Sequence, residues 1–96
     1  MMEYFGYKVR IATKYHAVLY KKFEHEDIFI NQVMKISLAK GEYAANVELG
    51  IADTYINQQV LDLLQIALNR TKKDLREYGQ TIINKMKESW KLVWLF

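Results

Sequence analysis

Apolar and polar residues alternate along three segments of the first half of the chain, with the period of two that a half-buried β-strand requires. The first segment covers residues 5–11 and places four apolar side chains on one side: Phe5, Tyr7, Val9 and Ile11. The other two cover residues 34–38 and 45–51. Gly41 lies between them and can adopt a positive φ, so this region predicts a β-hairpin with a loop of roughly three to five residues.

Residues 12–24 fit two structures. An alternation that includes Ala17 and Leu19 fits a strand, whereas spacings of three and four counted from His16 fit a helical stripe. The Lys and Ala content favours the helix slightly, and the sequence leaves the choice open. The polar residues 24–27 that follow predict a loop.

The strongest pattern predicts a helix that begins at Asp53 or Thr54, either of which can cap it, and runs to about Tyr78, with Gly79 as its stop. Its polar residues form one narrow stripe with spacings of three and four: Asp62, Gln65, Asn69, Lys73 and Arg76. Most of the helix circumference must therefore be covered, by the sheet and by a second helix or a second subunit. Residues 80–96 also show helical spacing, so they form a helix that folds back after Gly79 or continue the first helix through it.

These elements predict one α+β domain over residues 1–96, in which a small antiparallel sheet packs on a long helix and a C-terminal helix. An all-α helical bundle is the alternative, if the N-terminal alternation is misleading. Apolar residues make up 51% of the 96-residue chain and charged residues 26%, which is the ordinary balance of a globular protein.

The net charge of +3 is unevenly distributed, with +4 over residues 1–22, −5 over 23–62 and +4 over 63–96. The chain has no cysteine, so it forms neither disulfides nor thiolate metal sites. Its start lacks the features of a signal peptide, and no apolar run approaches the roughly 20 residues of a membrane span. We therefore expect a cytoplasmic protein without an integral membrane segment.

Leucine and isoleucine recur every seven residues in the second half of the chain, as they do along a coiled-coil or bundle seam. Packing within the chain's own core is the alternative interpretation of the same spacing. The chain then ends on an apolar run, residues 90–96, that either packs into the core or anchors to a partner. The predicted partner or oligomer interface comprises Leu61, Leu68, Leu75, Tyr78, Ile82, Trp90 and Trp94.

Two basic sets suggest contacts with nucleic acid, because cations can bind phosphates while nearby aromatic rings stack on bases. The first set, Lys8, Arg10 and Lys14, lies among tyrosines near the N-terminus. The second set lies on the long helix: Lys72, Lys73 and Arg76. Solvated lysines opposite buried aromatic residues would explain the first set equally well.

Candidate chemistry is sparse. His16 and His25 lie near an acidic loop, but their spacing fits no structural zinc pattern, and we predict no metal and no cofactor. Neither Ser37 nor Ser89 has the context of a nucleophile, and no glycine-rich phosphate loop is present. The sequence therefore predicts a non-enzymatic protein-interaction module, an adaptor or inhibitor of the kind that phages and mobile elements direct at host factors. We expect it to self-associate, with nucleic-acid binding as the alternative function.

Overall fold

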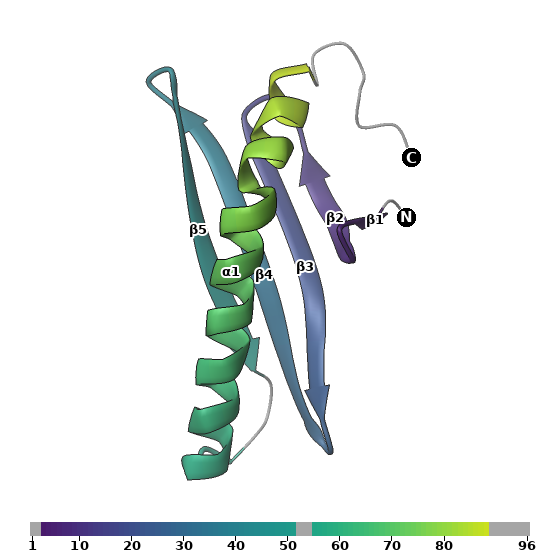
Figure 1. Ribbon diagram of the computed structural model, residues 1–96, viewed down its shortest axis with the longest axis vertical. Helices are drawn as coiled ribbons and strands as arrows, with labels where there is room; N and C mark the ends of the chain where they lie inside the picture. The colour runs from purple at the N-terminus through teal and green to yellow at the C-terminus, as the bar shows by residue number, and fades with distance from the viewer. Residues whose placement is uncertain (1–2, 52–54, 89–96) are drawn as a thin grey trace.

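A computed structural model of the chain, which describes residues 3–51 and 55–88, shows a five-stranded antiparallel sheet with one long helix on one of its faces (Figure 1). The strands lie in the sheet in their chain order, so every neighbouring pair is a hairpin. The elements are β1 (Glu3–Tyr4), β2 (Tyr7–Ala12), β3 (His16–His25), β4 (Ile28–Ala39), β5 (Glu42–Ile51) and α1 (Gln58–Glu88). This arrangement confirms the predicted α+β class and excludes the all-α alternative.

The segment that the sequence left open, residues 12–24, contains no helix: Ala12 ends β2, residues 13–15 form a turn, and the remaining residues lie in β3. β3 pairs along its whole length with β4, from His16 opposite Ser37 to His25 opposite Ile28. The helical spacing was misleading because β3 pairs with β4 on one side and, over part of its length, with β2 on the other, and this pairing outweighs a small difference in helix propensity.

The two long hairpins turn more tightly than the sequence predicts. The turn between β3 and β4 is only Glu26–Asp27, with Glu26 at a φ of 54°. The turn between β4 and β5 is Lys40–Gly41, where both residues have positive φ. Two-residue turns of this kind match the right-handed twist of the paired strands, so β3 to β5 are longer than the alternation alone indicates.

A β-bulge in β2 corrects the predicted alternation of residues 5–11. Val9 pairs with Leu19, but Ile11 pairs with Val18, so Arg10 is the extra residue between the two pairs. The extra residue moves the following side chain to the other face of the sheet. Val9 is therefore buried beneath the helix at 6% exposure, whereas Ile11 lies on the opposite face and is 46% exposed.

A tight turn at Phe5–Gly6 folds β1 back onto β2, and both turn residues have positive φ. Glycine adopts this conformation without strain, but for phenylalanine it costs about 1 kcal/mol. The ring of Phe5 stacks on Tyr78 of α1 with centroids 4.1 Å apart and an interplanar angle of 8°. This contact between the first hairpin and the helix offsets the backbone strain.

The helix is a single element of 31 residues, which corresponds to about 46 Å of length. Asn57 caps it, because its side-chain Oδ1 accepts a hydrogen bond from the Val60 backbone N–H at 3.0 Å. The predicted caps lie in residues 52–54, outside the described residues. α1 does not stop at Gly79 but continues through it to Glu88, so no separate C-terminal helix begins at residue 80. The predicted helical extension beyond Glu88 lies outside the described residues.

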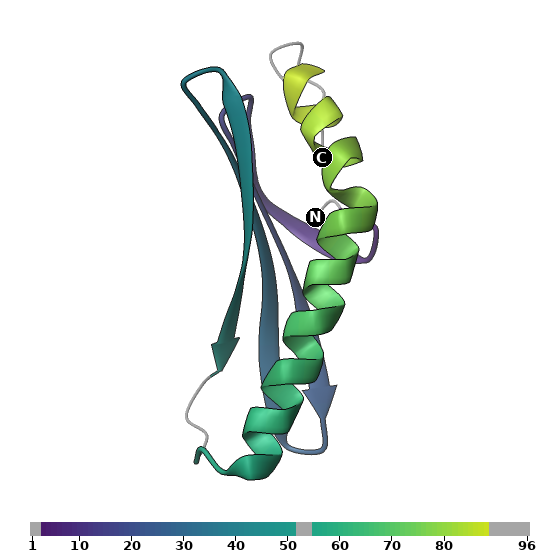
Figure 2. The ribbon, with the colours of Figure 1, turned by 60° about the vertical axis from the view of Figure 1, so that its left-hand side comes forward.

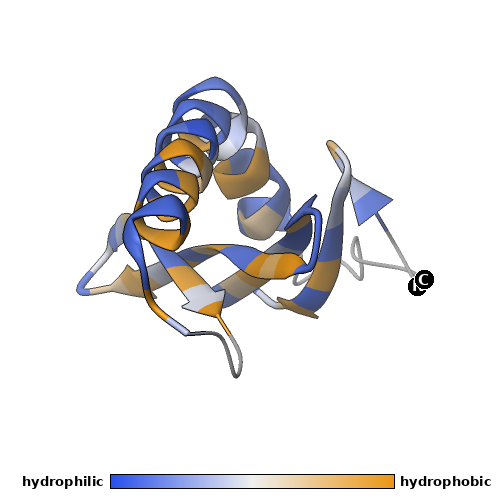
Figure 3. Cartoon of the chain, turned by 90° about the horizontal axis from the view of Figure 1, so that it is seen from below, coloured by the Kyte–Doolittle hydropathy of each residue, from blue (hydrophilic) through white to orange (hydrophobic). Residues whose placement is uncertain are grey.

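The core consists of two apolar clusters between α1 and the sheet, joined by a buried polar contact. The larger cluster contains Tyr7, Val9, Ala17, Leu19, Met34, Ile36, Ile82 and Met86. The smaller cluster contains Ile30, Leu63 and Ala67. Between them the Gln32 amide donates to the Thr71 hydroxyl at 2.8 Å, and that hydroxyl donates to the Ala67 carbonyl at 2.7 Å. The end-on view shows apolar positions of the helix turned toward the sheet (Figure 3).

Candidate interaction surfaces

One face of the sheet, here called the open face, is turned away from α1, and no described segment covers it (Figure 2). Strand register assigns side chains to this face, because directly paired residues project on the same side. Its central row is Lys8, Tyr20, Val33 and Glu48. The next row holds Ile11, Val18, Lys35 and Asn46. The open face therefore mixes apolar side chains with basic ones.

The structure brings two members of the first basic set together on the open face. Lys8 pairs across the strands with Tyr20, and Arg10 lines a hollow of about 260 Å³ together with Tyr20, Asn31 and Val33. Lys14 lies in the turn before β3, with its Nζ 5.8 Å from the Tyr15 ring centroid. A basic and aromatic cluster therefore exists here.

The second basic set lies on α1, and the sheet separates it from the open face. Lys72, Lys73 and Arg76 are all exposed. Lys73 lies 3.9 Å from Glu77 on the same helix. The two basic sets are therefore on opposite layers of the molecule and cannot contact one short ligand together.

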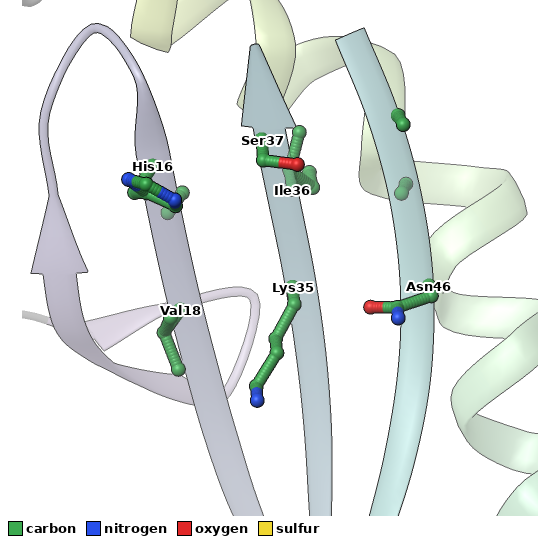
Figure 4. A pocket seen from close by; sticks show the side chains of 9 residues that line it. His16, Val18, Lys35, Ile36, Ser37 and Asn46 are labelled. Carbon is green, nitrogen blue, oxygen red and sulfur yellow. The ribbon is translucent and has the colours of Figure 1, made fainter. Parts of the chain in front are cut away.

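A second hollow of about 360 Å³ lies near the other end of the open face (Figure 4). His16 and Ser37 are directly opposite on β3 and β4, but no hydrogen bond joins them among the described residues. Lys35 Nζ instead contacts Glu48 Oε2 at 2.9 Å. The hydrogen bond that would activate a serine nucleophile is not formed in this part of the chain.

The predicted seven-residue seam does not form a single surface. A seven-residue step falls about 20° short of two full turns, so the seam rotates steadily around a straight helix. Leu61 at its start is 48% exposed and Ile82 is fully buried in the larger core cluster. Leu75 and Tyr78 pack against that cluster. The last two members of the predicted interface, Trp90 and Trp94, lie outside the described residues.

The exposed start of the seam lies on the side of α1 that is nearer to β5, here called the β5 flank and defined by Leu61 and Leu68. On the opposite side, the Arg70 guanidinium lies 5.2 Å from the Phe23 ring centroid of β3. Leu68 precedes Arg70 by two residues, a rotation of about 200°, so it is turned away from β3. Beside the β5 flank runs the outer edge of β5, which pairs with no other strand among the described residues.

The edge of β5 is a feature that sequence reasoning missed. Its pairing with β4 is continuous from Ile51 to Glu42 without a bulge, so the strand is long and regular. It contains neither proline nor lysine, the residues that most often protect an edge strand from pairing. Its charged residues are Glu42 and Glu48, and Glu48 is already paired with Lys35.

One titratable group, Tyr7, is fully buried under α1. Its hydroxyl donates to Asp74 Oδ2 at 2.6 Å. Burial raises the pKa of the Tyr7 phenol, and the hydrogen bond to the Asp74 carboxylate and that group's negative charge raise it further. The pair links β2 to the middle of α1 and has no access to a ligand from the open face.

Within residues 3–51 and 55–88, no group of three or more His, Asp or Glu side chains is placed to hold a metal ion. The same part of the chain contains no helix with the length and apolar character needed to cross a membrane.

The described residues define a two-layer α+β protein in which none of them covers the open face or pairs with the outer edge of β5. Comparison with protein-family models, curated proteins and solved structures gave no significant match.

Proposed function

We propose that this protein is a non-enzymatic protein-interaction module that self-associates through the outer edge of β5 and the adjacent β5 flank of α1. The observation that supports this most directly is the outer edge of β5, Glu42–Ile51, which pairs with no other strand in the part of the chain that the structure describes. An unpaired strand edge presents a row of backbone N–H and C=O groups that a second copy can pair with. A two-fold axis beside β5 then gives one continuous sheet from two chains.

The position of α1 agrees with such a dimer. The helix packs mainly on β4 and β5. Neighbouring strands are about 4.8 Å apart, so the two helix axes would lie about 10 Å from each other across the two-fold axis. Packed helices have interaxial distances of about 8–10 Å. Leu61 and Leu68 face the space between the helices and would become buried there.

Replacing Leu61 and Leu68 with glutamate is expected to shift the protein from dimer to monomer. Two charges per chain would have to be buried at the helix contact, and the dissociation constant should rise by about 100-fold or more. Sedimentation equilibrium over a range of protein concentrations measures this constant directly. The circular dichroism spectrum should keep its helical signal, because Leu61 is already exposed in the single chain.

Ile66→Glu is the matched control, since Ile66 is 42% exposed and lies about 140° around the helix from Leu61. It adds charge to the same helix on a side away from β5, so it should leave the dissociation constant unchanged. A wild-type protein that stays monomeric at several hundred micromolar would contradict the proposal.

An adaptor or inhibitor role would use the same surfaces with a different protein as the partner. A protein that offers its own strand edge could replace the second copy at β5. We therefore expect the protein partner and the second copy of the chain to compete for the edge of β5.

Binding of single-stranded nucleic acid is the second candidate function, and it is supported by the cluster of Lys8, Arg10 and Tyr20 on the open face. An exposed sheet with cations around an aromatic ring is a common platform for single strands. The apolar neighbours Ile11 and Val33 and the acidic Glu48 in the same rows weaken this interpretation, because a backbone of phosphates gains nothing from them.

Alanine at Lys8, Arg10 and Lys14 together is expected to weaken binding of a labelled single-stranded oligonucleotide by about tenfold or more, if this second function is correct. Fluorescence polarisation at low and near-physiological salt measures the effect and its salt dependence. Alanine at the helix set, Lys72, Lys73 and Arg76, removes the same charge from the other layer and should change little. Equal affinity of both triple variants and wild type would rule out the open face as a nucleic-acid site.

A further inference from the structure

Among the described residues, the last part of β3, Lys21–His25, has a second unpaired edge, which lies on the β3 side of α1. β2 pairs with β3 only as far as Lys8 opposite Tyr20. From Lys21 to His25, β3 pairs with β4 alone among the described residues (Figure 1). β2 does not continue alongside because the Phe5–Gly6 turn directs the chain back toward the helix. The position beside Lys21–His25, in line with β2, is therefore not filled by any described strand.

This gap opens into a groove of about 370 Å³ between β3 and α1. Lys21 and Phe23 contribute to its sheet wall, and Arg70 and Lys73 contribute to its helix wall. The Arg70 guanidinium lies over the Phe23 ring, which holds the two walls together at 5.2 Å. The groove is therefore mainly polar and rich in cations, and Phe23 is the apolar residue in its lining.

The groove also contains the carboxylates of Glu24 and Asp74, but its four cations, Lys21, Lys22, Arg70 and Lys73, outnumber them. Lys21, Lys22 and Arg70 form no ion pair among the described residues. The carboxylate of Asp74 already accepts the Tyr7 hydrogen bond at 2.6 Å. Across the edge, on the open face, Lys8 and Lys22 line a further hollow of about 220 Å³. Cations thus flank the unpaired edge on both faces of the sheet.

We infer that this edge of β3 binds an acidic peptide in extended conformation, which adds to the sheet in line with β2. A peptide backbone offers alternating donors and acceptors, so it can satisfy both the N–H and the C=O groups of Lys21–His25. A phosphodiester backbone offers hydrogen-bond acceptors only, so it cannot satisfy the C=O groups of this edge. Side chains of an added strand alternate between the faces, so all acidic residues of an alternating peptide can face the helix side of the edge, where Arg70 and Lys73 lie.

This site is distinct from the self-association edge. It lies on the β3 side of α1, opposite to the β5 flank, so a change in one should leave the other intact.

The probe is a fluorescein-labelled peptide of alternating glutamate and valine, followed by fluorescence anisotropy with the full chain at low ionic strength. We expect it to bind, and a matched lysine–valine peptide not to bind. Arg70→Glu with Lys73→Glu should weaken binding by about tenfold or more, because two cations of the groove become anions. Lys72→Glu with Arg76→Glu makes the same change of net charge elsewhere on α1 and should keep most of the affinity.

Two N-methylated versions of the peptide test whether it adds as a strand. One is methylated at every glutamate and the other at every valine, so each lacks every second N–H donor. A strand turns alternate N–H groups toward its neighbour, so one version should lose binding and the other should retain it. Absence of binding by the unmodified probe would overturn the inference, and so would equal binding of both methylated versions. Stronger binding of oligothymidylate at the same site would show instead that the groove selects phosphate.

Discussion

Replacing Ile82 with alanine is expected to lower the free energy of unfolding by about 2–5 kcal/mol, the range found when a buried isoleucine is truncated. Ile82 is fully buried in the larger core cluster, between α1 and the strands that carry Leu19 and Met34. Removing its side chain leaves a cavity that the surrounding close-packed residues fill only in part. Urea unfolding followed by circular dichroism gives the change directly.

Leu61→Ala is the matched control from the same seven-residue series. Leu61 is 48% exposed, so its truncation should cost no more than about 0.5 kcal/mol. Both variants should be measured at low protein concentration, where self-association adds little to stability. Equal destabilisation by the two substitutions would contradict the rotation of the seam from solvent into the core.

Stability is expected to fall at alkaline pH because of Tyr7. Its phenol is neutral and buried in the folded protein, and burial together with the Asp74 carboxylate raises its pKa above the ordinary value of about 10. The stabilising contribution is therefore fully present below pH 10, where both states hold the proton. Above about pH 10 the unfolded chain loses the proton first, and stability falls by up to about 1.4 kcal/mol per pH unit from this group.

Tyr7→Phe isolates this effect from the titration of other groups. At pH 8 the variant should be less stable by about 1–3 kcal/mol, since it lacks the hydrogen bond to Asp74. The difference from wild type should then shrink as the pH rises above 10. Tyr55→Phe, which removes an exposed hydroxyl, should leave the pH profile unchanged. A constant difference between Tyr7→Phe and wild type from pH 8 to pH 11 would contradict the role of this pair.

The strands predicted from alternation were correct for the two segments in which apolar and polar residues alternate without interruption. Residues 34–38 and 45–51 both lie in such strands, with their apolar side facing α1. The prediction was wrong where a single inserted residue shifts the phase, as at Arg10, because Ile11 then changes face. No local pattern marks that bulge, since it depends on how β2 meets β3.

The candidate surfaces were harder to predict than the elements. The sequence marked Leu61 and Ile82 as equivalent, although one is exposed and the other fully buried. It gave Lys8 and the helix cations as two separate basic sets but could not place them relative to each other, and the structure puts the sheet between them. Neither unpaired edge could be found, because which strands end a sheet follows from the order of pairing over the whole chain.

By itself the sequence favoured the α+β class over an all-α bundle, and it determined the position of the hairpin at Gly41 and the presence of a long amphipathic helix. These features depend on local periodicity and backbone preference, which are read within a few residues. Only the tertiary structure decided that α1 passes through Gly79 and covers one face of the sheet. It also decided that, within residues 3–51 and 55–88, the outer edge of β5 and the Lys21–His25 edge of β3 remain unpaired, because the order and extent of strand pairing depend on the whole sheet and not on a local pattern.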